Sequence, residues 1–281
     1  MTRQQSHTLA VRAITAVSVL VIVPILLVIG YVVAHGIGTV DWTFLTQPPR
    51  DGMRAGGIMP ALLGTLVLAA GTAVVTLPAG IGAAIFLAEY AGDNRMTRAV
   101  RLAIVNLAGI PSIVYGLFGL GAFVLFLRFG TSIVAGALTL GIMTLPVVIS
   151  TAEEAIRAVP DQFRTVSLSL GATRWQTIRH HVLPHALPGI LTGIILGLGR
   201  AAGETAPILF TVAAFYLPEL PRSIFDQTMA LPYHLYVIST QVPGMPLGMQ
   251  YGTALVLLLL VLSMTLSATL IRTRMRRRRE W

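Results

Sequence analysis

The sequence predicts an all-α membrane protein with six transmembrane helices. The chain of 281 residues is 55% hydrophobic and 11% charged, with a mean hydropathy of +0.79, whereas a soluble domain is about 25% charged. Six apolar stretches reach the roughly 20 residues that a helix needs to cross the hydrocarbon core of a bilayer. Because lipid tolerates no open sheet edge, these stretches are predicted to be helices.

The six expected spans set the domain organisation. We expect them at Ala13–Val33, Pro60–Ala88, Leu102–Leu127, Thr131–Ser150, Ala186–Thr211 and Gly252–Ile271. The resulting division is an N-terminal segment 1–12, a first helix 13–34, a core 60–271 with five spans and a loop at 151–185, and a basic tail 272–281. The first stretch could also be a signal peptide. Its apolar run exceeds the roughly 7 to 15 residues of a signal core, so we expect a retained helix.

The arginines indicate how the chain is oriented in the membrane. With the N-terminus placed inside, the cytoplasmic segments carry fifteen arginines and the outer loops four, and Arg200 lies within a span. This asymmetry follows the positive-inside rule and predicts that both termini are cytoplasmic. The formal charge of +9 is therefore explained by membrane topology rather than by nucleic-acid binding. The basic tail is expected to contact anionic lipid headgroups.

The composition excludes several kinds of chemistry. The chain has no cysteine, and all 20 of its basic residues are arginine. Without lysine it lacks the Gly-Lys-Ser/Thr step of a phosphate-binding loop, so ATP would be hydrolysed on another subunit. No constellation suited to hydrolysis is present, and we predict no enzymatic activity and no cofactor. His180, His181 and His185 are interrupted by Pro184 and have no nearby carboxylate, so no metal site is expected.

The loop at 151–185 is long enough to have a function of its own. Pro160 is expected to end the helix that leaves the fourth span, and a second helix is expected to run to Gly171. A further helical start follows at Thr173. A loop of about 35 residues with repeated helical starts is uncommon unless it binds something. We therefore favour docking of a partner over a simple connector.

A motif within this loop resembles the "EAA loop" of ABC-importer permeases. The family pattern is Glu-Ala-Ala-x3-Gly-x9-Ile-x-Leu-Pro, and Gly171, Leu183 and Pro184 stand at its spacing. Thr165-Val166-Ser167 replaces Glu-Ala-Ala, and His181 replaces the isoleucine. The resemblance implies that 164–177 docks on an ATPase subunit. The implied coupling residues are Arg164, Thr165, Ser167, Gly171, Arg174, Leu183 and Pro184.

Two charged residues lie inside the fifth expected span. Arg200 and Glu204 are four residues apart, so they share a helical face and can pair. A charge within the bilayer costs at least about 3 kcal/mol, and such residues usually face a bundle interior or a pathway. The alternative is a purely structural ion pair. A guanidinium fork suits an oxyanion, because it offers paired donors and keeps its charge.

Two longer strings are similar to the permeases of phosphate-specific ABC importers of the PstA type. They are Gly-Arg-Ala-Ala-Gly-Glu-Thr-Ala-Pro at 199–207 and Gly-Ile-Pro-Ser-Ile-Val-Tyr-Gly-Leu-Phe-Gly at 109–119. The resemblance implies the type I ABC-importer permease fold and import of inorganic phosphate. Arg200 and Glu204 are the expected pathway residues, with Ser112 and Tyr115 as further hydroxyl donors. Tyr115 could equally be a packing aromatic.

The same resemblance implies partners. They are a second permease subunit of the PstC type, a cytosolic ATPase dimer of the PstB type and an extracytoplasmic phosphate-binding protein of the PstS type, in the bacterial cytoplasmic membrane. The first helix is expected to wrap a partner. Two rival functions stay open at this point. One is a permease for another oxyanion, such as molybdate or sulfate, and the other is a membrane-embedded enzyme acting on a lipid substrate.

Three further segments carry structural predictions. Glu153 and Glu154 are expected to form a solvated helix end. The outer segment 230–238 is either a short interfacial helix or a coil packed on the bundle. Close helix packing is predicted at three small residues spaced four apart, which are Gly189, Gly193 and Gly197.

Overall fold

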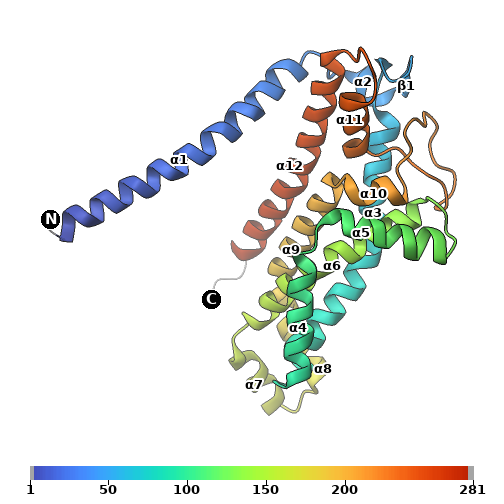
Figure 1. Ribbon diagram of the computed structural model, residues 1–281. Helices are drawn as coiled ribbons and strands as arrows, with labels where there is room; N and C mark the ends of the chain where they lie inside the picture. The colour runs from blue at the N-terminus through green and yellow to red at the C-terminus, as the bar shows by residue number, and fades with distance from the viewer. Residues whose placement is uncertain (1–2, 278–281) are drawn as a thin grey trace.

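The computed structural model describes residues 3–277 and is almost entirely helical (Figure 1). The first two residues of the predicted N-terminal segment and the last four of the predicted basic tail lie outside this range. The long helices are α1 (Arg3–Gly36), α3 (Met59–Ile85), α4 (Arg95–Ala108), α6 (Ile133–Arg157), α9 (Leu183–Gly203) and α12 (Leu247–Arg277).

Shorter elements connect and cap these helices. They are α2 (Trp42–Thr46), α5 (Ser112–Gly119), α7 (Asp161–Ser169), α8 (Arg174–Thr177), α10 (Ala206–Thr211) and α11 (Leu231–Thr240). Three π-helical segments continue neighbouring helices. They are η1 (Phe86–Tyr90) after α3, η2 (Leu120–Phe126) after α5, and η3 (Ile178–Val182) between α8 and α9. Strands β1 (Pro49–Arg50) and β2 (Ala55–Gly56) form a small antiparallel hairpin.

Five helical segments are long and apolar enough to cross a membrane, and one bent pair of helices is a sixth candidate span. The five segments are Ile14–Gly36, Met59–Tyr90, Ile133–Arg157, Arg174–Gly203 and Leu247–Met275. The bent pair joins α4 to the segment Ser112–Phe126 at an angle of 100°. The predicted all-helical architecture is confirmed, but the third expected span, Leu102–Leu127, is wrong as a single straight helix.

The bend in the third span has a local cause. Gly109 caps the C-terminus of α4, and Pro111 lacks the N–H that a continuing helix needs and disfavours helical geometry before it. The carbonyl of Leu107, among the last four of α4, accepts from the N–H of Ile110 at 3.1 Å. The hydroxyl of the buried Tyr115 donates to this carbonyl at 2.7 Å. Tyr115 thus holds the corner together.

The fifth expected span is also interrupted. Ala186–Thr211 was predicted as one helix, but α9 ends at Gly203 and Glu204 is extended, with φ −77° and ψ 133°. The chain restarts as α10, which has a proline in its first turn. Since proline is tolerated at the start of a helix but not in its interior, Pro207 favours this break.

Helices α6 and α9 pack closely through small residues, as predicted. A β-carbon added at Gly193 would overlap the side chain of Thr151. One at Gly189 would lie 2.6 Å from the β-carbon of Ala155, and one at Gly197 would lie 3.3 Å from Val148 Cγ2. The absent side chains let the two backbones approach, which fixes the position of α9 against the core.

We call the end of the bundle that carries α7 and α8 the loop end. At the opposite end lies α11. The segment predicted at 230–238 is therefore a short helix, as in the first alternative, and it is packed on the bundle, as in the second. Leu231 and Ile238 are at most 1% exposed and pack with Phe44 and Ile58. This cluster closes the opposite end over α3 and α12.

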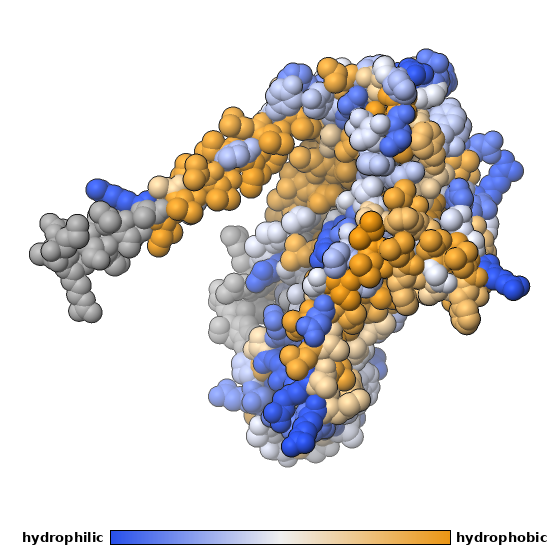
Figure 2. Space-filling model, viewed as in Figure 1, coloured by the Kyte–Doolittle hydropathy of each residue, from blue (hydrophilic) through white to orange (hydrophobic). Residues whose placement is uncertain are grey.

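Helix α1 leaves the bundle at an angle and touches it only near its C-terminal end (Figure 1). A β-carbon at Gly36 would lie 2.9 Å from the carbonyl carbon of Tyr251, and the Tyr31 and Tyr251 rings meet edge to face at 5.5 Å. The large apolar side chains of α1 between Val11 and Val28 are exposed (Figure 2). An uncovered apolar surface of this size marks contact with lipid or with another subunit, so partner wrapping stays a prediction.

The α6–α9 contact predicts a position-specific response to one added methyl group. Gly193→Ala should destabilise the protein by about 1–3 kcal/mol, because the methyl group enters a filled contact. Gly82→Ala is the matched control, since a β-carbon there meets nothing within 4 Å. Thermal unfolding in detergent measures both variants. Equal midpoints for the two would contradict this account of the packing.

A buried histidine predicts sensitivity to acid. His234 on α11, outside the spanning helices, is 2% exposed, and neither ring nitrogen has a hydrogen-bond partner in the described chain. Burial lowers the pKa of its imidazole from 6.5 to about 4. Only the unfolded state then gains a proton between these values, so stability should fall as the pH drops from 6.5 towards 4, by about 3 kcal/mol in total.

The measurement is the unfolding midpoint as a function of pH for the intact protein and for His234→Phe. The variant should lose this part of the acid sensitivity, whereas His180→Phe, at an exposed site, should keep it. An unchanged acid response in His234→Phe would refute the assignment.

Candidate substrate path and docking loop

The predicted loop at 151–185, which we call the docking loop, contains a helical hairpin whose turn depends on Gly171. Pro160 precedes the first turn of α7. Gly171 has φ +85°, the left-handed region that a side chain disfavours. The N–H groups of Gly171 and Ala172 donate to the carbonyls of Leu168 and Ser167 at 3.0 and 3.2 Å. This is the Schellman pattern, which satisfies the last carbonyls of a helix.

Polar contacts then fold α8 back onto α7. Thr173 caps α8, and Gln176 completes a capping box, which satisfies donors at the start of the helix. The hydroxyls of Ser167 and Thr177 lie 2.9 Å apart in a buried position. The loop is therefore an ordered element with a defined surface.

That surface is apolar where it faces away from the bundle. Val166, Leu170 and Trp175 are 60%, 84% and 50% exposed. Beside them a cleft of about 470 Å³ is lined by Gln162, Phe163, Val166, Ser167, Leu170, Ala172 and His181. Exposed apolar residues gathered beside a cleft are typical of a protein-binding surface.

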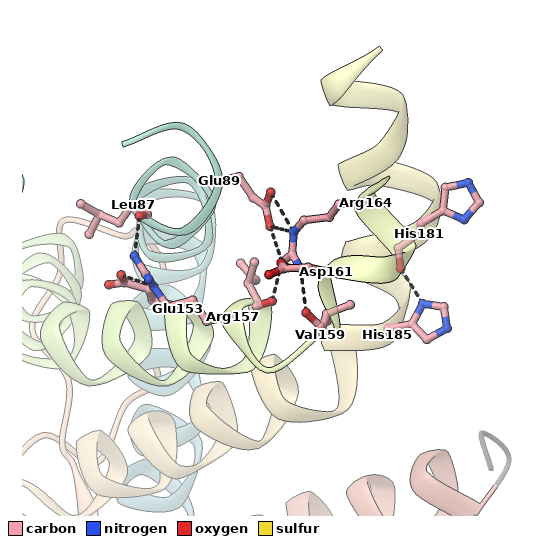
Figure 3. Close-up of polar contacts among 10 residues, drawn as sticks. Leu87, Glu89, Glu153, Arg157, Val159, Asp161, Arg164, His181 and His185 are labelled. Atoms are coloured by element: carbon pink, nitrogen blue, oxygen red, sulfur yellow. Dashed lines mark hydrogen bonds and ion pairs between the residues drawn. The ribbon is translucent and has the colours of Figure 1, made fainter. Parts of the chain in front are cut away.

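Arg164 points into the permease rather than out of the docking loop (Figure 3). Its side chain is 19% exposed and that of Glu89 is 7% exposed. Nε and Nη2 donate to Glu89 Oε1 at 3.0 and 2.7 Å. Nη1 donates to the Val159 carbonyl at 2.6 Å and Nη2 to the Ile156 carbonyl at 2.9 Å. Arg164 thus ties α7 to the ends of α6 and η1.

A second buried carboxylate lies close by, and it corrects a prediction. Glu153 was expected to be part of a solvated helix end, but it is 8% exposed. Its Oε1 accepts from Arg101 Nε and from Arg157 Nε, both at 2.9 Å. The same two arginines donate through Nη2 to the Leu87 carbonyl, at 2.9 and 3.2 Å. Glu153 thus pairs with one arginine of α4 and one of α6, and both arginines also hold the carbonyl of Leu87 in η1. Glu154 is exposed as expected.

The other predicted docking residues are distributed around the hairpin. Thr165 is exposed and its hydroxyl donates to the Asp161 carbonyl at 3.1 Å. The guanidinium of Arg174 lies 5.3 Å from the centre of the Tyr90 ring, a cation–π distance. Leu183 and Pro184 form the first turn of α9.

The histidines near this turn have ordinary backbone partners. A ring nitrogen of His180 lies 3.0 Å from the Gln176 carbonyl, and one of His185 lies 2.5 Å from the His181 carbonyl. Within residues 3–277 no group of three histidine or carboxylate side chains is arranged to hold a metal ion.

In the membrane region Arg200 and Glu204 form the predicted pair at the break after α9. Arg200 Nε lies 3.2 Å from Glu204 Oε1. The Arg200 side chain is 48% exposed and that of Glu204 is 16% exposed. Arg200 is on the last turn of α9, and Glu204 follows the helix end. The guanidinium therefore faces a surface of this chain, while the carboxylate is partly covered.

The two broken spans lie against each other. A β-carbon at Gly116 would lie 2.9 Å from the carbonyl oxygen of Ala206, so α5 can rest on α10 only because this residue is glycine. The structure thus brings together the two strings that the sequence singled out. Ser112 is partly exposed at the start of α5, and its hydroxyl makes no hydrogen bond within the described residues. The Tyr115 hydroxyl is already engaged by Leu107, which favours the packing alternative for that residue.

Sequence reasoning missed Glu89 and Arg101 entirely. A signal was available in both cases, because a charged residue directly beside an apolar span must find a partner or reach water. The two residues are separated in sequence from their partners by 75 and 52 positions. No local pattern predicts such pairings.

Solved structures show the same fold class. A bacterial ABC transporter that imports the acidic polysaccharide alginate matches with a TM-score of 0.67 at 14% identity, over 97% of this chain and 96% of that chain. The inward-facing MetNI methionine ABC transporter matches with a TM-score of 0.57 at 17% identity, over 78% of this chain and 94% of that chain. The fold is that of type I ABC-importer permeases, as predicted.

The sequence comparisons define the family. Residues 77–277 match the family of binding-protein-dependent transport system inner membrane components, and the chain belongs to this family. It is 36% identical to phosphate transport system permease protein PstA 1 of Mycobacterium tuberculosis H37Rv, over 85% of this chain and 79% of that protein. It is 33% identical to the probable ABC transporter permease protein YqgI of Bacillus subtilis, over 75% of this chain and 76% of that protein.

Family membership settles several points. The chain is a multi-pass membrane subunit of an ABC importer, and its partners are of the ATPase and binding-protein kinds. The prediction of a non-enzymatic permease is confirmed, because the relatives are permease subunits and ATP hydrolysis lies on a separate subunit. The rival interpretation as a lipid-processing enzyme is therefore excluded.

Proposed function

We propose that the chain is the permease subunit of an ATP-driven importer of inorganic phosphate and forms the translocation path with a second permease subunit of the PstC type. An ATPase dimer of the PstB type and a phosphate-binding protein of the PstS type complete the machine. The observation that carries this proposal is the half-exposed Arg200 at a helix break, in a chain 36% identical to a phosphate permease.

The chemistry of Arg200 supports an oxyanion substrate. Its guanidinium bonds Glu204 through Nε, so the rest of the fork is available to a passing anion. Phosphate and carboxylate both accept paired hydrogen bonds from this fork and would compete for it. In our mechanism the Arg200–Glu204 pair closes the path at rest, and opening lets Arg200 exchange the carboxylate for phosphate. Ser112, at the break in the third expected span, offers a further hydroxyl.

The docking loop supports the coupling half of the proposal. ATP-driven closure of the ATPase subunits would act on 164–177 through the exposed side chains Val166, Leu170 and Trp175. Gly171, Ser167 and the start of α9 at Leu183 and Pro184 would hold the hairpin in shape. Contact with the cytosolic ATPase requires the loop end to be cytoplasmic. Both termini are then cytoplasmic as well, which agrees with the fifteen-to-four distribution of arginines.

Substrate identity is tested by ATP hydrolysis in the reconstituted complex. Binding protein loaded with phosphate should stimulate hydrolysis, and sulfate or molybdate at equal concentration should not. The readout is the hydrolysis rate in liposomes together with competition of radiolabelled phosphate uptake by each anion. Stimulation by sulfate or molybdate as strong as by phosphate would assign a different oxyanion.

The role of Arg200 is tested by Arg200→Gln. Phosphate uptake should fall by about tenfold or more, because a charge-assisted hydrogen bond to the anion is lost. Arg222→Gln removes a guanidinium whose side chain is 88% exposed at the opposite end and should leave uptake unchanged. Normal uptake by an assembled Arg200→Gln complex would remove Arg200 from the mechanism.

A further inference from the structure

Two buried carboxylates at the loop end lie outside the proposed substrate path and the exposed docking surface. The side chains of Glu89 and Glu153 are 7% and 11% exposed. Removing a carboxylate from water costs several kcal/mol unless it is paired and fully hydrogen-bonded. Their positions therefore need an explanation beyond membrane topology.

The Glu89 contact joins segments that the chain does not connect locally. The docking loop is covalently continuous with α6 and α9, whereas Glu89 belongs to η1 at the end of α3, 75 residues before Arg164. Arg164 bonds Glu89 through Nε and Nη2 and also caps the carbonyls of Ile156 and Val159. One guanidinium thus holds α7, the end of α6 and the end of α3.

The second contact extends this connection to α4. Leu87, two residues before Glu89, offers its carbonyl to Arg101 of α4 and Arg157 of α6. Both arginines also bond Glu153 Oε1. The end of α3 is therefore held by the docking loop through Glu89 and by α4 and α6 through Leu87.

Apolar packing also joins these elements. Ala84, Ile156 and Val182 belong to one buried cluster that joins α3, α6 and η3. Such contacts have no preferred direction, whereas charge-assisted bonds from a planar guanidinium fix both distance and orientation. The ion pairs therefore add a directional restraint to this contact.

We propose that Glu89 is a positioning residue for transport: it makes the docking loop and the end of α3 move as one body, and Leu87 and Glu153 pass this movement to α4. This inference rests on the proposed function. From α4 the movement reaches the corner at Leu107 and Tyr115, and then α5, which lies on α10 beside the Arg200–Glu204 pair. Glu89 thereby connects ATP hydrolysis with opening of the path.

The first test is Glu89→Gln in the full reconstituted complex. The amide keeps the shape but loses the charge, so phosphate transported per ATP hydrolysed should fall by about tenfold. The ATPase should remain bound and hydrolytically active. A role limited to folding would lower assembly, hydrolysis and uptake together and leave their ratio unchanged, which would overturn the proposal.

Two matched controls use nearby carboxylates. Asp93→Asn removes the exposed partner of Arg98, where the charged atoms lie 3.5 Å apart and the side chains are 84% and 65% exposed. Asp161→Asn removes the other carboxylate that contacts Arg164. The Asp161 side chain is 95% exposed. Both variants should keep the normal ratio of uptake to hydrolysis. A loss in either control equal to that in Glu89→Gln would also overturn the proposal.

A distance measurement covers the case in which Glu89→Gln does not assemble. The chain has no cysteine, so spin labels at Phe86→Cys on η1 and Ser169→Cys on α7 report one distance, and both sites are exposed. With Glu89 intact, the distance should be the same in nucleotide-free and ATP-trapped complexes. With Glu89 intact, a distance that changes between these two states would overturn the proposal. In an assembled Glu89→Gln complex, a distance that stays the same between the two states would also overturn it.

These outcomes are distinct from failure of the proposed function. If the unmodified complex does not transport phosphate, the substrate assignment fails, and the spin-label distances still test the Glu89 connection because they need only ATP. If the unmodified complex transports phosphate and Glu89→Gln does so with the same yield per ATP, the Glu89 connection alone fails.

Discussion

The structure depends on one constraint: backbone groups freed at a helix end within or beside the membrane must find a partner inside the protein. Water is absent from the bilayer core, and burial largely excludes it from the helix ends around Glu89 and Glu153. In this chain arginine side chains do much of this work at the loop end, where the carbonyls of Leu87, Ile156 and Val159 accept from Arg101, Arg157 and Arg164. The buried carboxylates Glu89 and Glu153 balance the charge that the arginines bring.

The same constraint explains why the two interrupted spans lie together. Each break interrupts the backbone hydrogen bonds of its span, and polar side chains beside each break find partners within the protein. Tyr115 satisfies the Leu107 carbonyl at the first break. At the second, Glu204 leaves the helix and meets Arg200. Glycines at the contact bring α5 and α10 close enough to share one local environment. A transport path needs such irregular backbone, because regular apolar helices offer an ion nothing to bind.

In our two proposals, coupling and permeation use the same chemical pair in two settings. At the loop end the Arg164 and Glu89 side chains are 19% and 7% exposed and share several hydrogen bonds, which favours a rigid joint. At the helix break Arg200 is half-exposed and bonds its carboxylate through a single nitrogen, which favours exchange with a passing anion. Burial and the number of hydrogen bonds, rather than residue type, distinguish a joint from a gate.

The sequence by itself determined the membrane class, the approximate positions of the spans, the docking hairpin with its Gly171 turn, and the Arg200–Glu204 pair. Each depends on local composition or on residues within a few positions, where hydropathy and helical spacing act directly. Only the tertiary structure decided that the third and fifth spans are interrupted, that Arg164 turns inward to Glu89, and that Glu153 is buried between two arginines. These outcomes arise from contacts between residues far apart in the chain, and the balance between desolvation and pairing exists only once the helices have packed.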